Sequence, residues 1–133
     1  KGKSGLILGG RATYSNWILR SLDEESLSDS EASFYDGIVK YNHQFNPDSK
    51  LSATAYFSDD AFSITSDSLY GFQNRLFSIK YNEALSENTR GEVILASSDY
   101  KFDINYDSDL EDRFELGYHI NETEIKFNLN LRI

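Results

Sequence analysis

Hydrophobic and polar residues alternate one by one along most of the chain, and residues 34–57 show the pattern on two successive segments. There Val39 lies on one side of the pattern and Lys40 on the other. Because side chains of a β-strand point to opposite faces with a period of two, such a pattern predicts an amphipathic strand. A second strand follows at 51–57, and the Asn-Pro-Asp-Ser sequence at 46–49 has the residues of a tight turn. This stretch therefore predicts a β-hairpin with one apolar and one polar face.

The same alternation predicts further strands, at about residues 5–19, 71–85, 90–106, 113–120 and 125–133. Residues 121–123 are predicted to be a short turn. The alternation changes phase near Asn16 and near Ser97–Ser98, and one extra residue in a β-bulge would explain each change. The sequence therefore predicts an all-β fold, an antiparallel up-and-down meander of about seven long strands.

Short turns and long connections alternate along this meander, and the long connections fall at 22–33, 59–70 and 99–112. Outer-membrane barrels combine short periplasmic turns with longer extracellular loops, and a tilted spanning strand needs roughly 9–11 residues. A bacterial single-chain barrel closes with an even number of strands from about eight upward. We therefore expect residues 1–133 to be a β-barrel wall segment, part of a larger transmembrane β-barrel whose other strands are outside this sequence.

In such a barrel one face of the sheet meets lipid and the other lines a watery lumen. The residues expected to face lipid are Val39, Tyr41, Ala53, Ala55, Leu95, Phe127 and Leu129. The residues expected to face the lumen are Arg11, Lys40, Asn42, Thr54, Lys80, Lys126 and Asn130. Aromatic girdles are expected at the two interfaces, with Tyr14, Tyr35, Phe57, Phe72 and Tyr100 near the loops and Tyr41, Phe45, Tyr81 and Tyr118 near the turns. A soluble, lipocalin-like barrel would instead pack the apolar residues into a dry centre.

The net charge of −9 comes from 22 acidic and 13 basic residues. It argues against nucleic acid as a partner, because nucleic-acid binding requires a basic surface. Most of the acidic residues fall in the predicted long connections. The chain has no cysteine, which excludes a disulfide framework and a thiolate metal site.

The sequence offers little catalytic chemistry, and we expect no enzyme activity and no cofactor. His43 and His119 both lie beside predicted short turns, and neither has a Ser or Asp at a recognisable triad spacing. A weak candidate for Ca²⁺ is an acidic run with hard oxygen ligands, at Asp107, Asp109, Glu111 and Asp112. It lacks the glycine and the spacing of an EF-hand loop, and such a run is more often a solvated loop.

Four short stretches, at residues 11–19, 33–36, 51–60 and 97–102, carry a resemblance to a known family. They read Arg-Ala-Thr-Tyr-Ser-Asn-Trp-Ile-Leu, Ser-Phe-Tyr-Asp, Leu-Ser-Ala-Thr-Ala-Tyr-Phe-Ser-Asp-Asp and Ser-Ser-Asp-Tyr-Lys-Phe. Their order and the strand rhythm around them resemble the barrel of TonB-dependent outer-membrane transporters, in particular the Bacteroidota type with a carboxypeptidase-regulatory-like domain before the plug. The resemblance implies a barrel of about 22 strands. It also implies an N-terminal plug domain and a periplasmic contact box, which we expect to be outside this sequence.

The resemblance further implies part of an active importer in the outer membrane of a Gram-negative bacterium, with the three predicted loops taking part in uptake of a nutrient ligand. The expected partners are outer-membrane lipid, the remaining barrel strands and plug of the same protein, and an inner-membrane energising complex reached through parts outside this chain. Two alternatives stay open at the level of sequence. One is a soluble all-β, lipocalin-like binding module, and the other is a non-transport outer-membrane barrel for adhesion or assembly.

Overall fold

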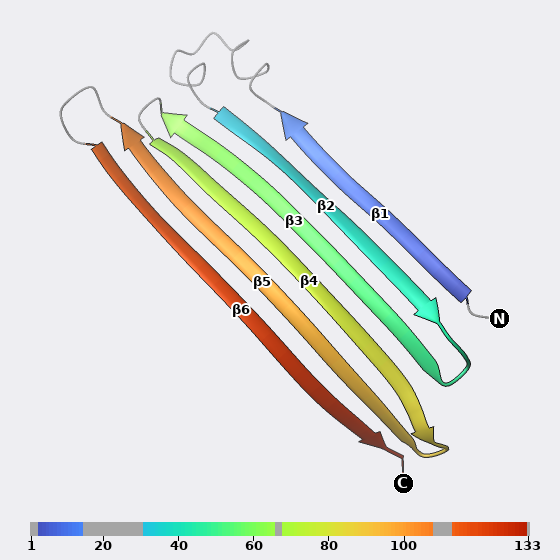
Figure 1. Ribbon diagram of the computed structural model, residues 1–133. Coiled ribbons are helices and arrows are strands. Elements are labelled where there is room, and N and C mark those ends of the chain that lie inside the picture. Colours follow the sequence, from blue (N-terminus) through green and yellow to red (C-terminus); the bar gives the residue numbers. More distant parts are fainter. Residues whose placement is uncertain (1–2, 15–30, 66–67, 108–112, 133) are drawn as a thin grey trace.

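The computed structural model describes residues 3–14, 31–65, 68–107 and 113–132, and its regular structure is entirely β-strand. The strands are β1 (Lys3–Tyr14), β2 (Glu31–Gln44), β3 (Ser49–Thr65), β4 (Ser68–Ser86), β5 (Thr89–Asp107) and β6 (Arg113–Leu131). They form one antiparallel sheet in chain order (Figure 1). The predicted all-β, up-and-down meander is therefore confirmed. No helix within these ranges is long and apolar enough to cross a membrane.

The predicted turn between β2 and β3 is present and is closed by the side chain of Asn46. Its Oδ1 accepts hydrogen bonds from the backbone N–H groups of Asp48 and Ser49, both at 2.8 Å. The N–H of Phe45 donates to the carbonyl of Ser49 at 3.1 Å. A second short turn at 87–88 joins β4 to β5 at the same end of the sheet. We call this the turn end, and the opposite end, where β1, β3 and β5 finish, the far end.

The predicted turn at 121–123 is wrong. β6 runs unbroken through these residues and pairs with β5 along its whole length. Asn121 lies opposite Asp99 and Thr123 opposite Ser97. The backbone groups of 121–123 therefore have ladder partners in β5, and this pairing outweighs the weak turn preference of Asn-Glu-Thr. The two strands predicted on either side are one strand.

The long connections are also shorter than predicted. β3 continues to Thr65 and β4 begins at Ser68, so most of the predicted loop at 59–70 is strand. β5 continues to Asp107, which agrees with the strand predicted at about 90–106 and places much of the loop predicted at 99–112 in the sheet. β2 begins at Glu31, within the predicted loop at 22–33. The remaining parts of the three loops lie outside the described residues.

The bulge predicted near Ser97–Ser98 is wrong. Ser97 lies opposite Phe77, Ser98 opposite Leu76 and Asp99 opposite Arg75, without a break in register. Register shifts occur elsewhere, between Phe62 and Thr65 and between Ala84 and Ser86. The bulge predicted near Asn16 lies outside the described residues.

Within the described ranges the sheet is a single layer, and no other described element packs on either face (Figure 1). No hydrophobic side chain in the described ranges is buried. Within the same ranges β1 pairs only with β2 and β6 only with β5, so these two strands form open edges. A dry centre, as expected for a lipocalin-like barrel, is not formed by the residues that the structure describes.

Candidate functional site

Residues that lie opposite one another in neighbouring strands form rows across the sheet, and all members of a row share a face. One such row crosses every strand, at Leu6, Tyr41, Ala53, Ile79, Leu95 and Ile125. We call the side of the sheet that carries it the first face. All the residues predicted to face lipid lie on this side: Val39, Tyr41, Ala53, Ala55, Leu95, Phe127 and Leu129.

The first face is mostly apolar and exposed over the half of the sheet nearer the turns, with Ser4 and His43 as a polar pair near the turn end. Phe127 is 76% exposed, Leu8 68% and Leu129 63%. In β4 the first-face residues from Leu85 to Phe77 are apolar apart from Glu83, which accepts a hydrogen bond from the hydroxyl of Tyr81 at 2.9 Å. We call this half of the first face the apolar band. It extends across all six strands.

The opposite side, the second face, is polar at the same level. It carries all the residues predicted to face the lumen: Arg11, Lys40, Asn42, Thr54, Lys80, Lys126 and Asn130. Ser52 donates to the Asn42 side chain at 2.7 Å, and Asn128 donates to Glu92 at 2.9 Å. The ammonium group of Lys80 lies 3.6 Å from Glu92. Second-face side chains alone line a hollow of about 520 Å³ around Lys80. This half of the second face is therefore mainly polar and joined by cross-strand hydrogen bonds, with Ile7 and Ile94 also lining the hollow.

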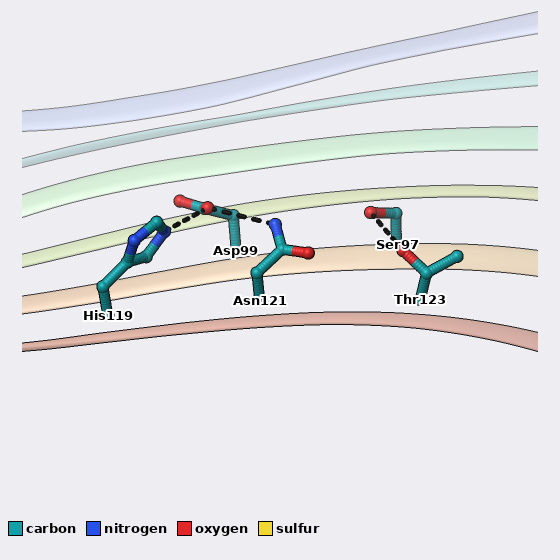
Figure 2. A network of polar contacts seen from close by, with 5 residues as sticks. All are labelled: Ser97, Asp99, His119, Asn121 and Thr123. Atoms are coloured by element: carbon teal, nitrogen blue, oxygen red, sulfur yellow. Dashed lines mark hydrogen bonds and ion pairs between the residues drawn. The ribbon is translucent and has the colours of Figure 1, made fainter.

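The first face changes character at one level of the sheet. Phe77 in β4 is followed on the first face by Arg75, and the opposite position in β5 is Asp99. Figure 2 shows that Asp99 receives two side chains from β6. The Nε2 atom of His119 lies 2.6 Å from its carboxylate, and Asn121 donates to the same oxygen at 3.3 Å. From this level to the far end the first face is dominated by polar and charged residues in β4, β5 and β6.

The second face changes in the opposite sense. Towards the far end it carries an aromatic cluster, made up of Phe62, Tyr70, Phe72, Phe102 and Tyr118 on β3 to β6. The ring centroids of Phe62 and Tyr70 are 4.8 Å apart with the planes at 8°. Phe72 and Phe102 are 4.9 Å apart, and Phe102 and Tyr118 are 6.1 Å apart. The two faces of the sheet thus exchange polarity partway along the strands.

The predicted girdles fit this arrangement only in part. Tyr118 lies opposite Phe102 near the far end, so its assignment to the turn end is wrong. Tyr35 and Phe57 lie on the first face, whereas Phe72 and Tyr100 lie on the second, so these four do not form one belt. The signal that could have revealed the exchange was present in the sequence. The change of phase in β5 and β6, attributed to a bulge and a turn, marks the level where the apolar residues move to the other face.

The two histidines lie far apart. His43 is near the turn end, as predicted, with its Nδ1 atom 2.7 Å from the hydroxyl of Ser4 and 3.4 Å from that of Tyr41. His119 was predicted at the turn end, which is wrong, because it lies in the far half beside Asp99. Within the described part of the chain, the polar contacts of His43 are to hydroxyl groups and those of His119 to a carboxylate, and the two sets are not combined into a triad.

The predicted calcium ligands cannot be placed. Asp109, Glu111 and Asp112 lie outside the described residues, as does the side chain of Asp107. In the ranges that are described, no group of three or more His, Cys, Asp or Glu side chains could hold a metal ion.

The site is therefore a surface rather than a cavity, with an apolar band on one side of the sheet and a hydrogen-bonded polar surface behind it. A comparison with models of known protein families finds no match, and a comparison with curated protein sequences finds none either.

Proposed function

We propose that this chain is part of the wall of an outer-membrane β-barrel, and that the barrel belongs to an active importer. The proposal of a barrel wall is supported by the sheet itself. The sheet has no buried core in the described ranges, and an exposed apolar band crosses every strand. Behind the band lies a polar surface with cross-strand hydrogen bonds. A barrel wall in lipid needs these two surfaces, one on each side.

The exposed apolar area argues against water on the first face. Apolar surface gains about 25 cal/mol per Å² when it leaves water. Soluble sheets recover this energy by packing the apolar face against another layer. Here large side chains such as Phe127 and Leu8 stand exposed. Hydrocarbon covers such a face without a second protein layer.

The open edges require further strands. An unpaired row of backbone N–H and C=O groups is not tolerated in hydrocarbon, because no water is present to satisfy it. β1 and β6 each have one unpaired edge within the described part of the chain. Both strands would therefore pair with the remaining strands of the same protein.

The importer assignment rests on the resemblance to TonB-dependent transporters. In that proposal the polar surface around Lys80 lines the lumen near the periplasmic turns, and the far end is extracellular. The plug and the inner-membrane energising complex act through parts outside this chain, and the transported ligand is a nutrient. No reaction is catalysed and no cofactor is needed.

The test uses the full-length protein in its native host. We expect it to fractionate with the outer membrane and to show a heat-dependent shift on a denaturing gel. Formaldehyde treatment of intact cells should cross-link it to an inner-membrane energising protein, and deletion of the periplasmic contact box should abolish this cross-linked adduct. A water-soluble monomer would contradict the barrel wall. An outer-membrane barrel with no plug and no adduct would contradict the importer and favour a role in adhesion or assembly.

A further inference from the structure

The strands are about twice as long as a membrane requires. β4, β5 and β6 each have 19 residues, whereas a tilted spanning strand needs roughly 9–11. The exchange of polarity between the two faces divides these strands into two halves. A single bilayer cannot cover both apolar regions, because the apolar band and the aromatic cluster lie on opposite faces.

We infer that the bilayer covers only the half of the sheet nearer the turns, that its hydrocarbon ends at the level of Ser97 and Thr123, and that the aromatic cluster lies inside the barrel beyond the membrane. This inference rests on the proposed barrel-wall function and adds the position of the lipid boundary. The occupant of the apolar band is hydrocarbon, and the first face beyond it meets headgroups and water.

The height of the apolar band supports this position. In β4 the band runs from residue 77 to residue 85 on the first face. With a rise of about 3.3 Å per residue and a tilt of about 40°, this stretch rises roughly 20–25 Å along a barrel axis, close to the apolar belt of about 25 Å in outer-membrane barrels. The aromatic cluster spans β3 to β6, whereas the apolar band spans every strand of the sheet.

The side chains at the boundary support the same level. Thr123 donates to Ser97 at 3.4 Å, and one row further towards the far end Asn121 and His119 both contact Asp99 (Figure 2). Charged and amide groups are costly in hydrocarbon at the bilayer midplane and nearly free at the interface. The network of Asp99 therefore belongs at or above the interface.

The side chains of the aromatic cluster contact one another across the strands. Its rings stack across neighbouring strands at centroid distances of 4.8 to 6.1 Å. Because no bulge intervenes in β5, the cluster shares its face with Lys80 and Lys126. If those lysines line the lumen, the cluster lines it too, nearer the extracellular mouth.

The test is a spin-label scan of the full-length barrel in lipid bilayers. Single cysteines replace Phe127, Ile125, Asn121, His119 and Glu115 in turn, all on the first face of β6, in a background without other cysteines. Oxygen collides with labels in hydrocarbon, and a water-soluble nickel chelate collides with labels in water. We expect labels at 125 and 127 to collide more often with oxygen, and labels at 119 and 115 to collide more often with the chelate. The heat-dependent shift on a gel shows whether each variant is folded. A parallel scan of the first face of β4, at Ile79, Phe77, Arg75 and Gln73, gives a second measurement of the boundary if variants of β6 fail to fold.

The outcomes separate the inference from the function on which it rests. Oxygen dominance that continues through 119 and 115 would overturn the inferred boundary and leave the barrel wall intact. A further label replaces Tyr118 on the second face. More frequent collisions with oxygen than with the chelate there would place the aromatic cluster against lipid and also overturn the inference. Chelate dominance at 125 and 127 would contradict the barrel wall itself.

Discussion

At the scale of single residues, the border of the apolar band is shaped by a ring packed over a glycine. Phe57 lies opposite Gly37, and a Cβ atom at Gly37 would overlap its ring. The same ring contacts Tyr35 edge to face, with centroids 6.2 Å apart and planes at 61°. An aromatic ring over a strand glycine replaces the packing that the glycine lacks. A side chain at position 37 would therefore require the Phe57 ring to move.

Replacing Gly37 tests this packing. We expect Gly37→Ala to displace the Phe57 ring and to lower the free energy of unfolding by about 1–2 kcal/mol, a typical cost of overpacking. Urea unfolding of the full-length barrel in lipid measures the change. Gly5→Ala is the matched control, because a Cβ there meets nothing within 4 Å, and it should be neutral or slightly stabilising. Equal effects of the two substitutions would refute this account of the pair.

Asn46 offers a second test at this scale, because one side-chain oxygen closes the turn between β2 and β3. We expect Asn46→Ala to lower the free energy of unfolding by about 1 kcal/mol, since two backbone N–H groups lose their protein acceptor. Asn46→Asp keeps an acceptor oxygen and should retain most of the stability. If the two variants unfold at the same urea concentration, the turn does not depend on this oxygen.

At the scale of elements, the alternation of side chains could be read from the sequence, whereas the ends of the strands could not. The hairpin around Asn46 was predictable because its turn chemistry is local. The segment 86–89, Ser-Glu-Asn-Thr, forms a turn, while the similar segment 121–123, Asn-Glu-Thr, lies within β6. The two differ in long-range pairing, because β5 extends far enough to pair with the whole of β6. Such pairing is decided between strands rather than within a short window of sequence.

The proposed second neighbour of β6 can be tested with adjacent prolines. Ladder hydrogen bonds of successive residues point to opposite edges of a strand. If β6 is paired on both edges in the full-length barrel, Glu124→Pro and Ile125→Pro each remove a ladder bond, and both should prevent assembly. The heat-shifted band on a gel measures assembly, with Glu124→Thr and Ile125→Val as controls that keep the N–H. Normal assembly of one proline variant would mean that β6 is a free edge.

At the scale of the whole molecule, the exchange of polarity between the faces explains why the candidate surfaces were only partly predicted. In the half nearer the turns, strict alternation was enough to group Val39 with Leu95 and Lys40 with Lys80. In the far half the residues still alternate, but the apolar ones lie on the second face, so Phe72 is on the same face as Lys80. The change of phase within β5 and β6 was a sign of this exchange, but it could be distinguished from a bulge or a turn only when the strands were aligned in register.

The absence of a core in the described ranges leads to a prediction about residues 1–133 alone. Without lipid or neighbouring strands, the apolar band stays in water and the ordering entropy of the sheet is not offset. We expect the isolated segment to be aggregated or unfolded in buffer without detergent. Sedimentation velocity and amide chemical-shift dispersion measure this. A soluble monomer that unfolds cooperatively would contradict the single-layer account.

The central claim, that the first face of the half nearer the turns meets lipid, is tested most directly at two adjacent residues of β5. Leu95 lies on the first face and Ile94 on the second, opposite Lys80 and Lys126. A photoreactive benzophenone side chain is placed at either position in the full-length protein in native outer membranes. We predict lipid adducts after irradiation at position 95 and none at position 94. Lipid adducts at 94, or only protein cross-links at 95, would contradict the claim.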